Sequence, residues 1–216
     1  MRKTIGLGAG GHAKVVIDIL SHDADVELVG LLDANRALHG TRVAGVPVVG
    51  GDDQLDALRS AGVTHAFIGV GCSGDARPRA RLYAAAIAAG FEPISAVHPR
   101  ATVSRTARIG AGATIMAGAV VNAEARLGDN VIVNTGAIVE HDCRIGPHAH
   151  IATGARLAST VDVGEGAHVG VGASIRQGIR IGPFAQVGAG AVVVKDVDGG
   201  TIVAGVPARV LKEAGV

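Results

Sequence analysis

From residue 98 to residue 193 the chain repeats one pattern of hydrophobic positions every six residues. When this segment is divided into blocks of six, the last residue of each of the sixteen blocks is Val, Ile or Leu. The residue two places earlier is always Ala, Val, Ile or Cys. A helical period of 3.6 would lose phase within a few blocks, whereas hexapeptide repeats form a parallel β-helix. The pattern therefore predicts a triangular β-helix over residues 98–193, with the aliphatic ladder inside.

Residues 1–97 follow a different pattern, in which short apolar runs alternate with segments of helical spacing. Strands are predicted at 4–9, 26–33 and 65–71, and helices at 12–21, 51–62 and 78–90. Alternation of this kind indicates a parallel sheet with helical crossovers. We therefore expect a small Rossmann-like α/β domain over 1–97. The β-helix follows it, and a C-terminal loop, strand and tail occupy 194–216.

Composition narrows the class of protein. The chain has 33 Gly and no Trp, which fits a repetitive core of small side chains. Its 20 basic and 19 acidic residues give a net charge of +1 and form no basic stripe, so a nucleic-acid groove is not expected. No apolar run reaches about 18 residues, so we expect no membrane span. With two cysteines and no signal peptide, a cytoplasmic protein with free thiols is the expectation.

Ionisable residues gather in one short stretch of the repeat, "IVEHDCRIGPHAHI". His141 and Asp142 occupy positions two and three of their block, so both are expected to face outward. An imidazole can take a proton near neutral pH, and a nearby carboxylate raises its basicity. The residues alone leave two interpretations open: a general base supported by Asp142 or Glu140, or a solvated pair on the wall of the β-helix. Cys143 holds the small inward position of its block, where packing is expected and a nucleophile is not.

The N-terminal "GLGAGG" places Gly6, Gly8 and Gly11 between a predicted strand and a predicted helix, and Asp33 ends the next strand. This spacing matches the dinucleotide fingerprint, in which glycines let the backbone approach a pyrophosphate. An NAD-dependent oxidoreductase is therefore a competing hypothesis. A dinucleotide crevice needs two half-domains, and residues 1–97 supply one. One nucleotide with its diphosphate is the better fit.

The hexapeptide repeat, the ending "GVPARVL" and the N-terminal "GAGGHAKVV" together resemble the hexapeptide-repeat sugar-nucleotide acetyltransferases over the whole chain. This family includes bacillosamine-, sialic-acid- and perosamine-type enzymes. The resemblance implies a left-handed β-helix and a cytoplasmic homotrimer acting in polysaccharide biosynthesis. It also implies acetyl transfer from acetyl-CoA to the amino group of a nucleotide-linked 4-amino-4,6-dideoxy sugar, with a GDP-linked sugar expected before a UDP-linked one.

The same resemblance assigns roles to individual residues. It implies that His141 is the general base, with Asp142 or Glu140 beside it. The residues it implies for the nucleotide sugar are Gly10, Gly11, His12, Asp33 and Gly71, with Asn134 and Thr135 as further contacts. The residues it implies for acetyl-CoA are His150, Val171, Ala189 and Arg209. Because the two halves of the site lie on different sides of the prism, a neighbouring subunit is expected to complete it.

Three other functions remain as alternatives. The chain could acetylate a hydroxyl of a sialic-acid-like sugar, or it could be a scaffold that binds a sugar nucleotide without catalysis. Trimeric β-helices can also hold zinc between subunits through three histidines, as the related carbonic anhydrases do. The histidines here lack a matching second-shell pattern, and zinc would leave the nucleotide domain unexplained. We therefore expect no metal.

Overall fold

The computed structural model describes residues 1–213, and the chain divides into two compact units. Unit 1 comprises Met1–Gly71 and Pro78–His98, and unit 2 comprises Cys72–Arg77 and the chain from Pro99 onward. The sequence pattern does not predict that Cys72–Arg77 belongs to unit 2, between two segments of unit 1. The last three residues of the predicted segment 194–216 lie outside the described residues. Within residues 1–213, no helix is long and apolar enough to cross a membrane.

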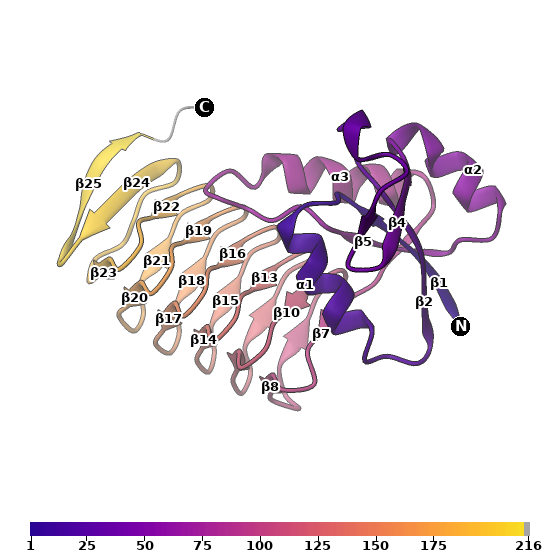
Figure 1. Cartoon of the computed structure of the whole chain (residues 1–216). Coiled ribbons are helices and arrows are strands. Elements are labelled where there is room, and N and C mark those ends of the chain that lie inside the picture. The colour runs from indigo at the N-terminus through magenta and orange to yellow at the C-terminus, as the bar shows by residue number, and fades with distance from the viewer. Residues whose placement is uncertain (214–216) are drawn as a thin grey trace. The chain divides into compact units, whose positions relative to one another are not determined.

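Unit 1 is an α/β unit built on one sheet (Figure 1). Its strands are β1 (Arg2–Leu7), β2 (Val26–Leu32), β3 (Arg42–Val43), β4 (Val46–Gly50), β5 (His65–Ile68), β6 (Glu92–Pro93) and β7 (Ala96–Val97). Its helices are α1 (Gly11–Leu20), α2 (Leu55–Ser60) and α3 (Arg77–Ala88), with short 3-10 turns η1 (Arg36–Leu38) and η2 (Asp52–Gln54). The first six strands form the sheet in the order β3-β4-β2-β1-β5-β6, and every pairing is parallel except β3 with β4.

The strand order fixes where unit 1 can bind a ligand. β1 pairs with β2 on one side and with β5 on the other, so the order of strands reverses at β1. In open parallel sheets, ligands bind beyond the carboxyl ends of the strands at such a switch point. α1 starts at this edge, and its apolar face packs on the sheet through Ala13, Val16, Ile17, Ile19 and Leu20. The predicted α/β fold is confirmed, and its ligand edge lies between the ends of β1 and β5.

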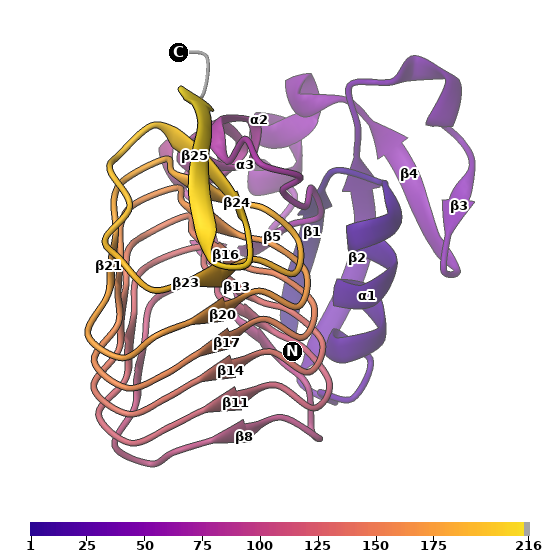
Figure 2. The same cartoon turned by 90° about the vertical axis from the view of Figure 1, so that its left-hand side faces the viewer.

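Unit 2 is a parallel β-helix with three sheets (Figure 2). Its sixteen two-residue strands are β8 (Thr102–Val103), β9 (Arg108–Ile109), β10 (Thr114–Ile115), β11 (Val120–Val121), β12 (Arg126–Leu127), β13 (Ile132–Val133), β14 (Ile138–Val139), β15 (Arg144–Ile145), β16 (His150–Ile151), β17 (Arg156–Leu157), β18 (Asp162–Val163), β19 (His168–Val169), β20 (Ser174–Ile175), β21 (Arg180–Ile181), β22 (Gln186–Val187) and β23 (Val192–Val193). β24 (Thr201–Gly205) continues one sheet beyond β22, and β25 (Ala208–Glu213) folds back on β24 as an antiparallel partner.

Strands of successive coils pair eighteen residues apart, as the six-residue period requires. Ile132 pairs with His150, and His150 pairs with His168. The last residue of each block points inward; Val133, Ile151 and Val169 are fully buried. Each such side chain contributes about 1.5–3 kcal/mol by its burial. The core is therefore a continuous aliphatic ladder, which leaves the second, third and fifth positions of each block free to carry chemistry.

Candidate functional site

His141 and Asp142 lie at the corner that follows β14. Nδ1 of His141 is 2.7 Å from Oδ2 of Asp142, and both side chains are more than half exposed. Asp142 adopts a left-handed backbone conformation with φ of 60°, which Asp tolerates better than most residues. This turn conformation places the Asp142 carboxylate beside the imidazole ring of His141. Because a carboxylate accepts, Nδ1 carries the proton and the lone pair of Nε2 is left for another partner.

Glu140 has a different set of contacts from Asp142. Its Oε2 accepts a hydrogen bond from Nδ2 of Asn122 at 3.0 Å and from the backbone N–H of His141 at 3.3 Å. Neither contact reaches the imidazole ring of His141. Of the two acids that the sequence offers as support for the imidazole, Asp142 is therefore the one in contact with it, and Glu140 holds the backbone of the corner.

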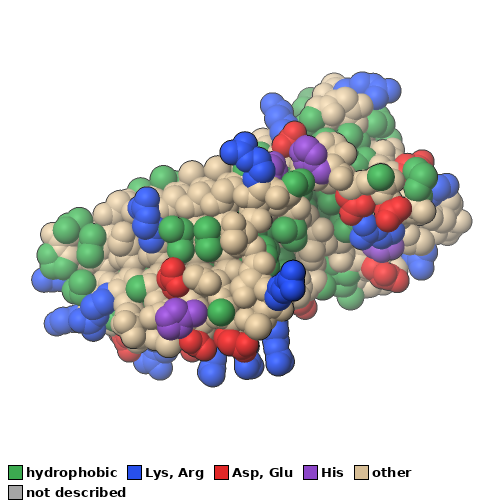
Figure 3. All heavy atoms as spheres, turned by 90° about the horizontal axis from the view of Figure 1, so that it is seen from below, with side chains coloured by type: hydrophobic (Ala, Val, Ile, Leu, Met, Phe, Trp, Pro, Cys, Tyr) green, Lys and Arg blue, Asp and Glu red, His purple; other side chains and the backbone are tan. Residues whose placement is uncertain are grey.

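A polar hollow of about 330 Å³ adjoins Asp142. It is lined by Glu124, Arg126, Asp142, Arg144, Thr160, Val161 and Asp162. The two arginines lie in the paired strands β12 and β15, and β12 also pairs with β9. Arg108, Arg126 and Arg144 are therefore in register on successive coils of one sheet. Figure 3 shows basic side chains in a row along one edge of the β-helix. The hollow beside Asp142 thus carries charges of both signs, with Arg126 and Arg144 facing Glu124, Asp142 and Asp162.

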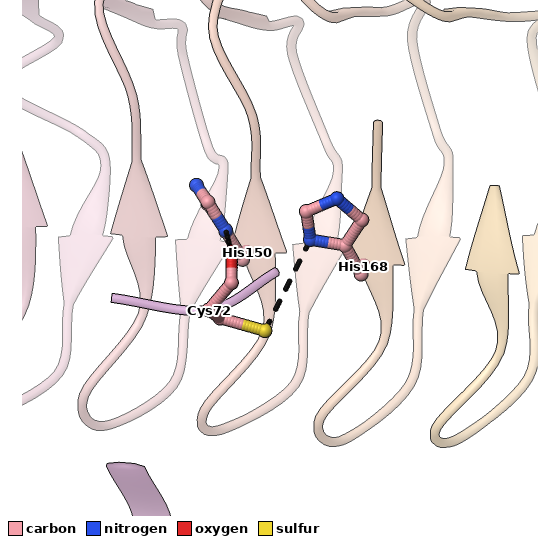
Figure 4. A group of neighbouring side chains, drawn as sticks. All are labelled: Cys72, His150 and His168. Carbon is pink, nitrogen blue, oxygen red and sulfur yellow. Dashed lines mark hydrogen bonds between the residues drawn. The ribbon is translucent and has the colours of Figure 1, made fainter. Parts of the chain in front are cut away.

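His150 lies in β16, on another sheet than β14, and the structure buries it to 6% exposure. Its Nδ1 is 2.9 Å from the carbonyl oxygen of Cys72 (Figure 4). Its Nε2 is 3.1 Å from Nδ2 of Asn134. A carbonyl accepts, so Nδ1 donates. The backbone N–H of Thr135 donates to Oδ1 of Asn134 at 2.7 Å, which turns the amide nitrogen of Asn134 toward His150. Nε2 therefore accepts, and His150 is a neutral imidazole with its proton on Nδ1.

His168 packs edge-on against His150, with ring centroids 4.9 Å apart. Burial lowers the pKa of the His168 imidazole below its usual value. Ligand atoms of Cys72, His150 and His168 lie within 4.8 Å of one another, an arrangement that could hold a metal ion. Binding a metal through His150 would break its hydrogen bond to the Cys72 carbonyl or the one to Asn134. The geometry therefore favours a hydrogen bond that holds Cys72 to His150 of the β-helix over a metal centre.

The acetyl-CoA residues expected from the resemblance lie at other places on the β-helix. Val171 and Ala189 are exposed and stack on successive coils at the corner that follows β19 and β22, where Gly190 N–H donates to Val171 O at 2.8 Å. Arg209 in β25 is exposed, and its Nη1 donates to the backbone oxygen of Ala208 at 2.9 Å. Within one chain, His141 stands at a different corner from Val171 and Ala189.

The glycine turn of unit 1 joins the end of β1 to α1. Gly8 has φ of 102°, and a side chain there would collide with Val70. Gly10 caps α1 without a side-chain hydrogen bond, and open space lies around the positions where Gly10 and Gly11 would carry a Cβ. The N-terminus of α1 therefore begins with two exposed glycines that leave room for a ligand, an arrangement suited to a phosphate.

Asp33 braces this turn. Its Oδ2 accepts from Ala9 N–H at 2.7 Å, and its Oδ1 accepts from Asn35 N–H at 2.8 Å. The backbone oxygen of Asp33 is 2.8 Å from Nε2 of His39. The structure thus brings Asp33 to the glycine turn, and it uses both carboxylate oxygens to hold the loops on either side of the ligand edge.

His12 and Gly71 face each other across the same edge. A Cβ placed on Gly71 would lie 3.4 Å from Cβ and 3.8 Å from Nδ1 of His12. On the other side of the ring, Nη1 of Arg79 is 3.5 Å from Nε2 of His12. Arg79 is 1% exposed, although the sequence places it in a helix as one of several basic residues. Sequence reasoning missed Arg79, because neither spacing nor a motif distinguishes it from exposed arginines.

Comparison with known proteins gives two family matches. The PglD N-terminal domain family matches residues 5–85, and the bacterial transferase hexapeptide family (six repeats) matches residues 124–159. No curated protein matches the chain.

Solved structures match almost the whole chain. PerB from Caulobacter crescentus, in complex with CoA and GDP-perosamine, is 42% identical with a TM-score of 0.89, and the match covers 96% of each chain. The chain belongs to the hexapeptide-repeat sugar-nucleotide acetyltransferases. The acetyltransferase domain of PglB from Neisseria gonorrhoeae is 39% identical with a TM-score of 0.90, covering 98% of this chain and 100% of that one. WeeI from Acinetobacter baumannii is 26% identical with a TM-score of 0.85, covering 97% and 99%.

Membership of these acetyltransferases confirms the predicted combination of a Rossmann-like domain and a left-handed β-helix. It also sets the NAD-dependent oxidoreductase aside, because the glycine turn belongs to a PglD-type domain. Further structures of the Caulobacter enzyme carry His141→Asn and His141→Ala substitutions, in the numbering of that enzyme. The PglB domain has also been solved with acetyl coenzyme A.

Proposed function

We propose that the protein transfers acetyl from acetyl-CoA to the amino group of a nucleotide-linked 4-amino-4,6-dideoxy sugar, with His141 as the general base. The observation that carries this proposal is the 2.7 Å contact between Nδ1 of His141 and Oδ2 of Asp142 at an exposed corner. A base must present a lone pair to solvent-accessible substrate, and this contact leaves Nε2 to do so.

The chemistry follows from that arrangement. The sugar amine attacks the thioester carbonyl, forming the C–N bond, while Nε2 of His141 takes the proton that the nitrogen loses. Collapse of the tetrahedral intermediate breaks the C–S bond, and the proton on Nε2 can pass to the leaving thiolate. The Asp142 carboxylate stabilises the imidazolium formed between these steps. A general base of this kind is typically worth about 10²–10⁴ in rate.

The nucleotide end of the substrate belongs to the ligand edge of unit 1. The unobstructed glycine turn and the N-terminus of α1 support binding of the diphosphate there. Gly10, Gly11, His12 and Gly71 line this edge, and Asp33 holds its shape through Ala9. A GDP-linked sugar is the first choice, because PerB, at 42% identity, has been solved with GDP-perosamine. A UDP-linked sugar is the second.

Acetyl-CoA belongs along the corner where Val171 and Ala189 stack, with Arg209 toward its phosphates. His141 stands at a different corner of the same prism, so one chain supplies only part of the site. This separation supports a homotrimer in which adjacent β-helices complete each site. Sedimentation should show a trimer in solution. A fully active monomer or dimer would contradict this part of the proposal.

His150 remains proposed for the acetyl-CoA site, and Asn134 and Thr135 for the sugar. The hydrogen bonds of His150 to the Cys72 carbonyl and to Asn134 hold its ring in place. Since acetyl-CoA and sugar nucleotides are cytoplasmic metabolites, we place the enzyme in the cytoplasm, in polysaccharide biosynthesis.

A thiol-release assay tests the proposal. Purified protein with acetyl-CoA is offered GDP- and UDP-linked 4-amino sugars and a free sialic-acid-like sugar, and free CoA thiol is measured. We expect release only with a nucleotide-linked amino sugar, and a product heavier by one acetyl group. Release with the free sugar alone would indicate an O-acetyltransferase, and binding of the nucleotide sugar without release would indicate a scaffold.

A further inference from the structure

Three side chains that can ligate a metal, those of Asp18, His22 and His98, gather at the carboxyl end of α1. One ligand atom of each residue lies within 4.8 Å of those of the other two. α1 begins at the ligand edge of unit 1, and its ten residues separate this end of the helix from that edge by about 15 Å. The three residues therefore lie apart from the proposed nucleotide site, and the proposed acetyl transfer does not use them.

The end of α1 and the strand β7 bring the three residues together within unit 1. Asp18 and His22 are four residues apart, a spacing that places side chains on the same face of a helix. The backbone N–H of His22 donates to the oxygen of Ile19 at 3.2 Å, so the helical turn extends to His22. His98 directly follows β7, which contacts α1. The rings of His22 and His98 meet edge-on, with their centroids 5.6 Å apart.

The ligand atoms can close around one ion without a change in the backbone. Zinc binds imidazole nitrogen at about 2.0–2.1 Å, so tetrahedral ligands stand about 3.4 Å from one another. Asp18 and His22 are exposed, and rotation of their side chains can shorten the present separations. His98 is half-buried and takes part in further interactions. These are compatible with ligation, because a ligating histidine commonly uses its second ring nitrogen for another contact.

The chemistry of the three residues selects the class of ion. Two imidazoles and one carboxylate suit zinc and related transition metals, whereas magnesium and calcium prefer oxygen ligands alone. The carboxyl end of a helix carries partial negative charge, which favours a cation beside Asp18 and His22. Three protein ligands leave one tetrahedral position to water, whereas permanent structural zinc sites usually have four protein ligands. The arrangement therefore favours an ion that exchanges with solution.

We propose that Asp18, His22 and His98 form an exchangeable site for a divalent transition-metal ion of the zinc class. The bound ion would join the end of α1 to His98, the last residue of unit 1 before the chain enters the β-helix. This site is separate from the histidines of the β-helix, for which no metal is expected. It also does not depend on the proposed function, since none of its ligands has a role in acetyl transfer.

Metal titrations of the full-length protein test the site. The protein is first freed of metal with EDTA and dialysed, and ZnCl₂ binding is then measured by titration calorimetry. We expect one strong zinc site per chain, and binding at least about tenfold weaker in His22→Ala and in Asp18→Asn, because each variant loses a ligand. CoCl₂ serves as a spectroscopic probe, and visible absorption of bound Co²⁺ should appear in the wild type and be lost in His22→Ala.

Two matched controls remove ligands from the other group of potential ligands, Cys72, His150 and His168. Cys72→Ser and His168→Gln should bind zinc as the wild type does. Melting temperatures provide an independent measure: zinc should raise that of the wild type and of both controls, and should raise that of His22→Ala less. Because His22 is exposed, the metal-free His22→Ala variant should melt close to the metal-free wild type.

Three results would overturn the proposal. The first is a metal-free wild type that takes up no zinc. The second is zinc binding of equal strength in the wild type, His22→Ala and Asp18→Asn, which would place the ion elsewhere on the chain. The third is loss of binding in Cys72→Ser or His168→Gln with retention in His22→Ala, which would assign the ion to the β-helix. None of these results bears on acetyl transfer, which the thiol-release assay tests separately.

Discussion

His141 and Asp142 are adjacent in sequence and in contact through their side chains, with Nδ1 and Oδ2 2.7 Å apart. Adjacent residues in a regular strand point to opposite faces and do not meet in this way. The left-handed turn at Asp142 makes the contact possible. The corner of the β-helix thus brings His141 and Asp142 together. In a regular strand the two side chains would point to opposite faces.

Replacing His141 with Asn removes the titratable ring and keeps a polar side chain. Because His141 is half exposed at a corner, the aliphatic core should be unaffected. We expect unchanged melting temperature and a rate of acetyl transfer at least about 10²-fold lower. Gln177, exposed at the equivalent position two coils further on, provides the control: Gln177→Ala should leave the rate unchanged. A variant at position 141 with most of the wild-type rate would show that solvent deprotonates the amine.

The two acids beside His141 should differ in their effect on the rate. Asp142→Asn removes the charge in contact with the ring, and Asn tolerates the left-handed backbone. Loss of a charged hydrogen-bond partner predicts a rate roughly ten- to a hundredfold lower. Glu140→Gln keeps an acceptor for Asn122 and for the His141 amide, so the rate should change little. The ratio of kcat between the two variants measures this, and the reverse order would assign the supporting role to Glu140.

Much of the β-helical site follows from the six-residue period alone. The period places His141 and Asp142 at outward corner positions, and it stacks His150 on His168. Once the aliphatic ladder sets the register, the side chain at each remaining position of a block has a fixed direction relative to the core. The repeat by itself therefore decides which of its residues face the core and which face outward.

Contacts made by the segment between β5 and α3 could not be predicted. Cys72 meets His150 across 78 residues of sequence, because the chain leaves unit 1 for six residues and returns. Such a path depends on loop conformation and not on periodicity. The burial of Arg79 could not be predicted for a related reason. It depends on hydrogen bonds to carbonyls near the end of β5, and no pattern in the sequence of α3 indicates them.

Cys143 should be chemically inert in the folded protein, although it follows the proposed base and acid. Its side chain is fully buried, and burial raises the pKa of the thiol to about 11. The thiolate, which is the reactive form, is then scarce at neutral pH. We expect iodoacetamide to modify Cys143 only after denaturation, as measured by mass spectrometry of the labelled peptides. Cys143→Ala should keep activity, and rapid labelling of the native protein with loss of activity would contradict the packing role.

His168 should make stability depend on pH. Burial lowers the pKa of this imidazole in the folded state, so the unfolded chain binds more protons in the range below the ordinary value of about 6.5. Stability is therefore present above that value and is lost as pH falls through the lowered pKa. We expect the melting temperature to drop as pH falls from about 7 to about 5. His168→Gln should reduce that drop, because Gln cannot take up a proton, and Gln186 shows that the next coil accommodates Gln at this position. Equal pH dependence in the two proteins would mean that other groups govern acid unfolding.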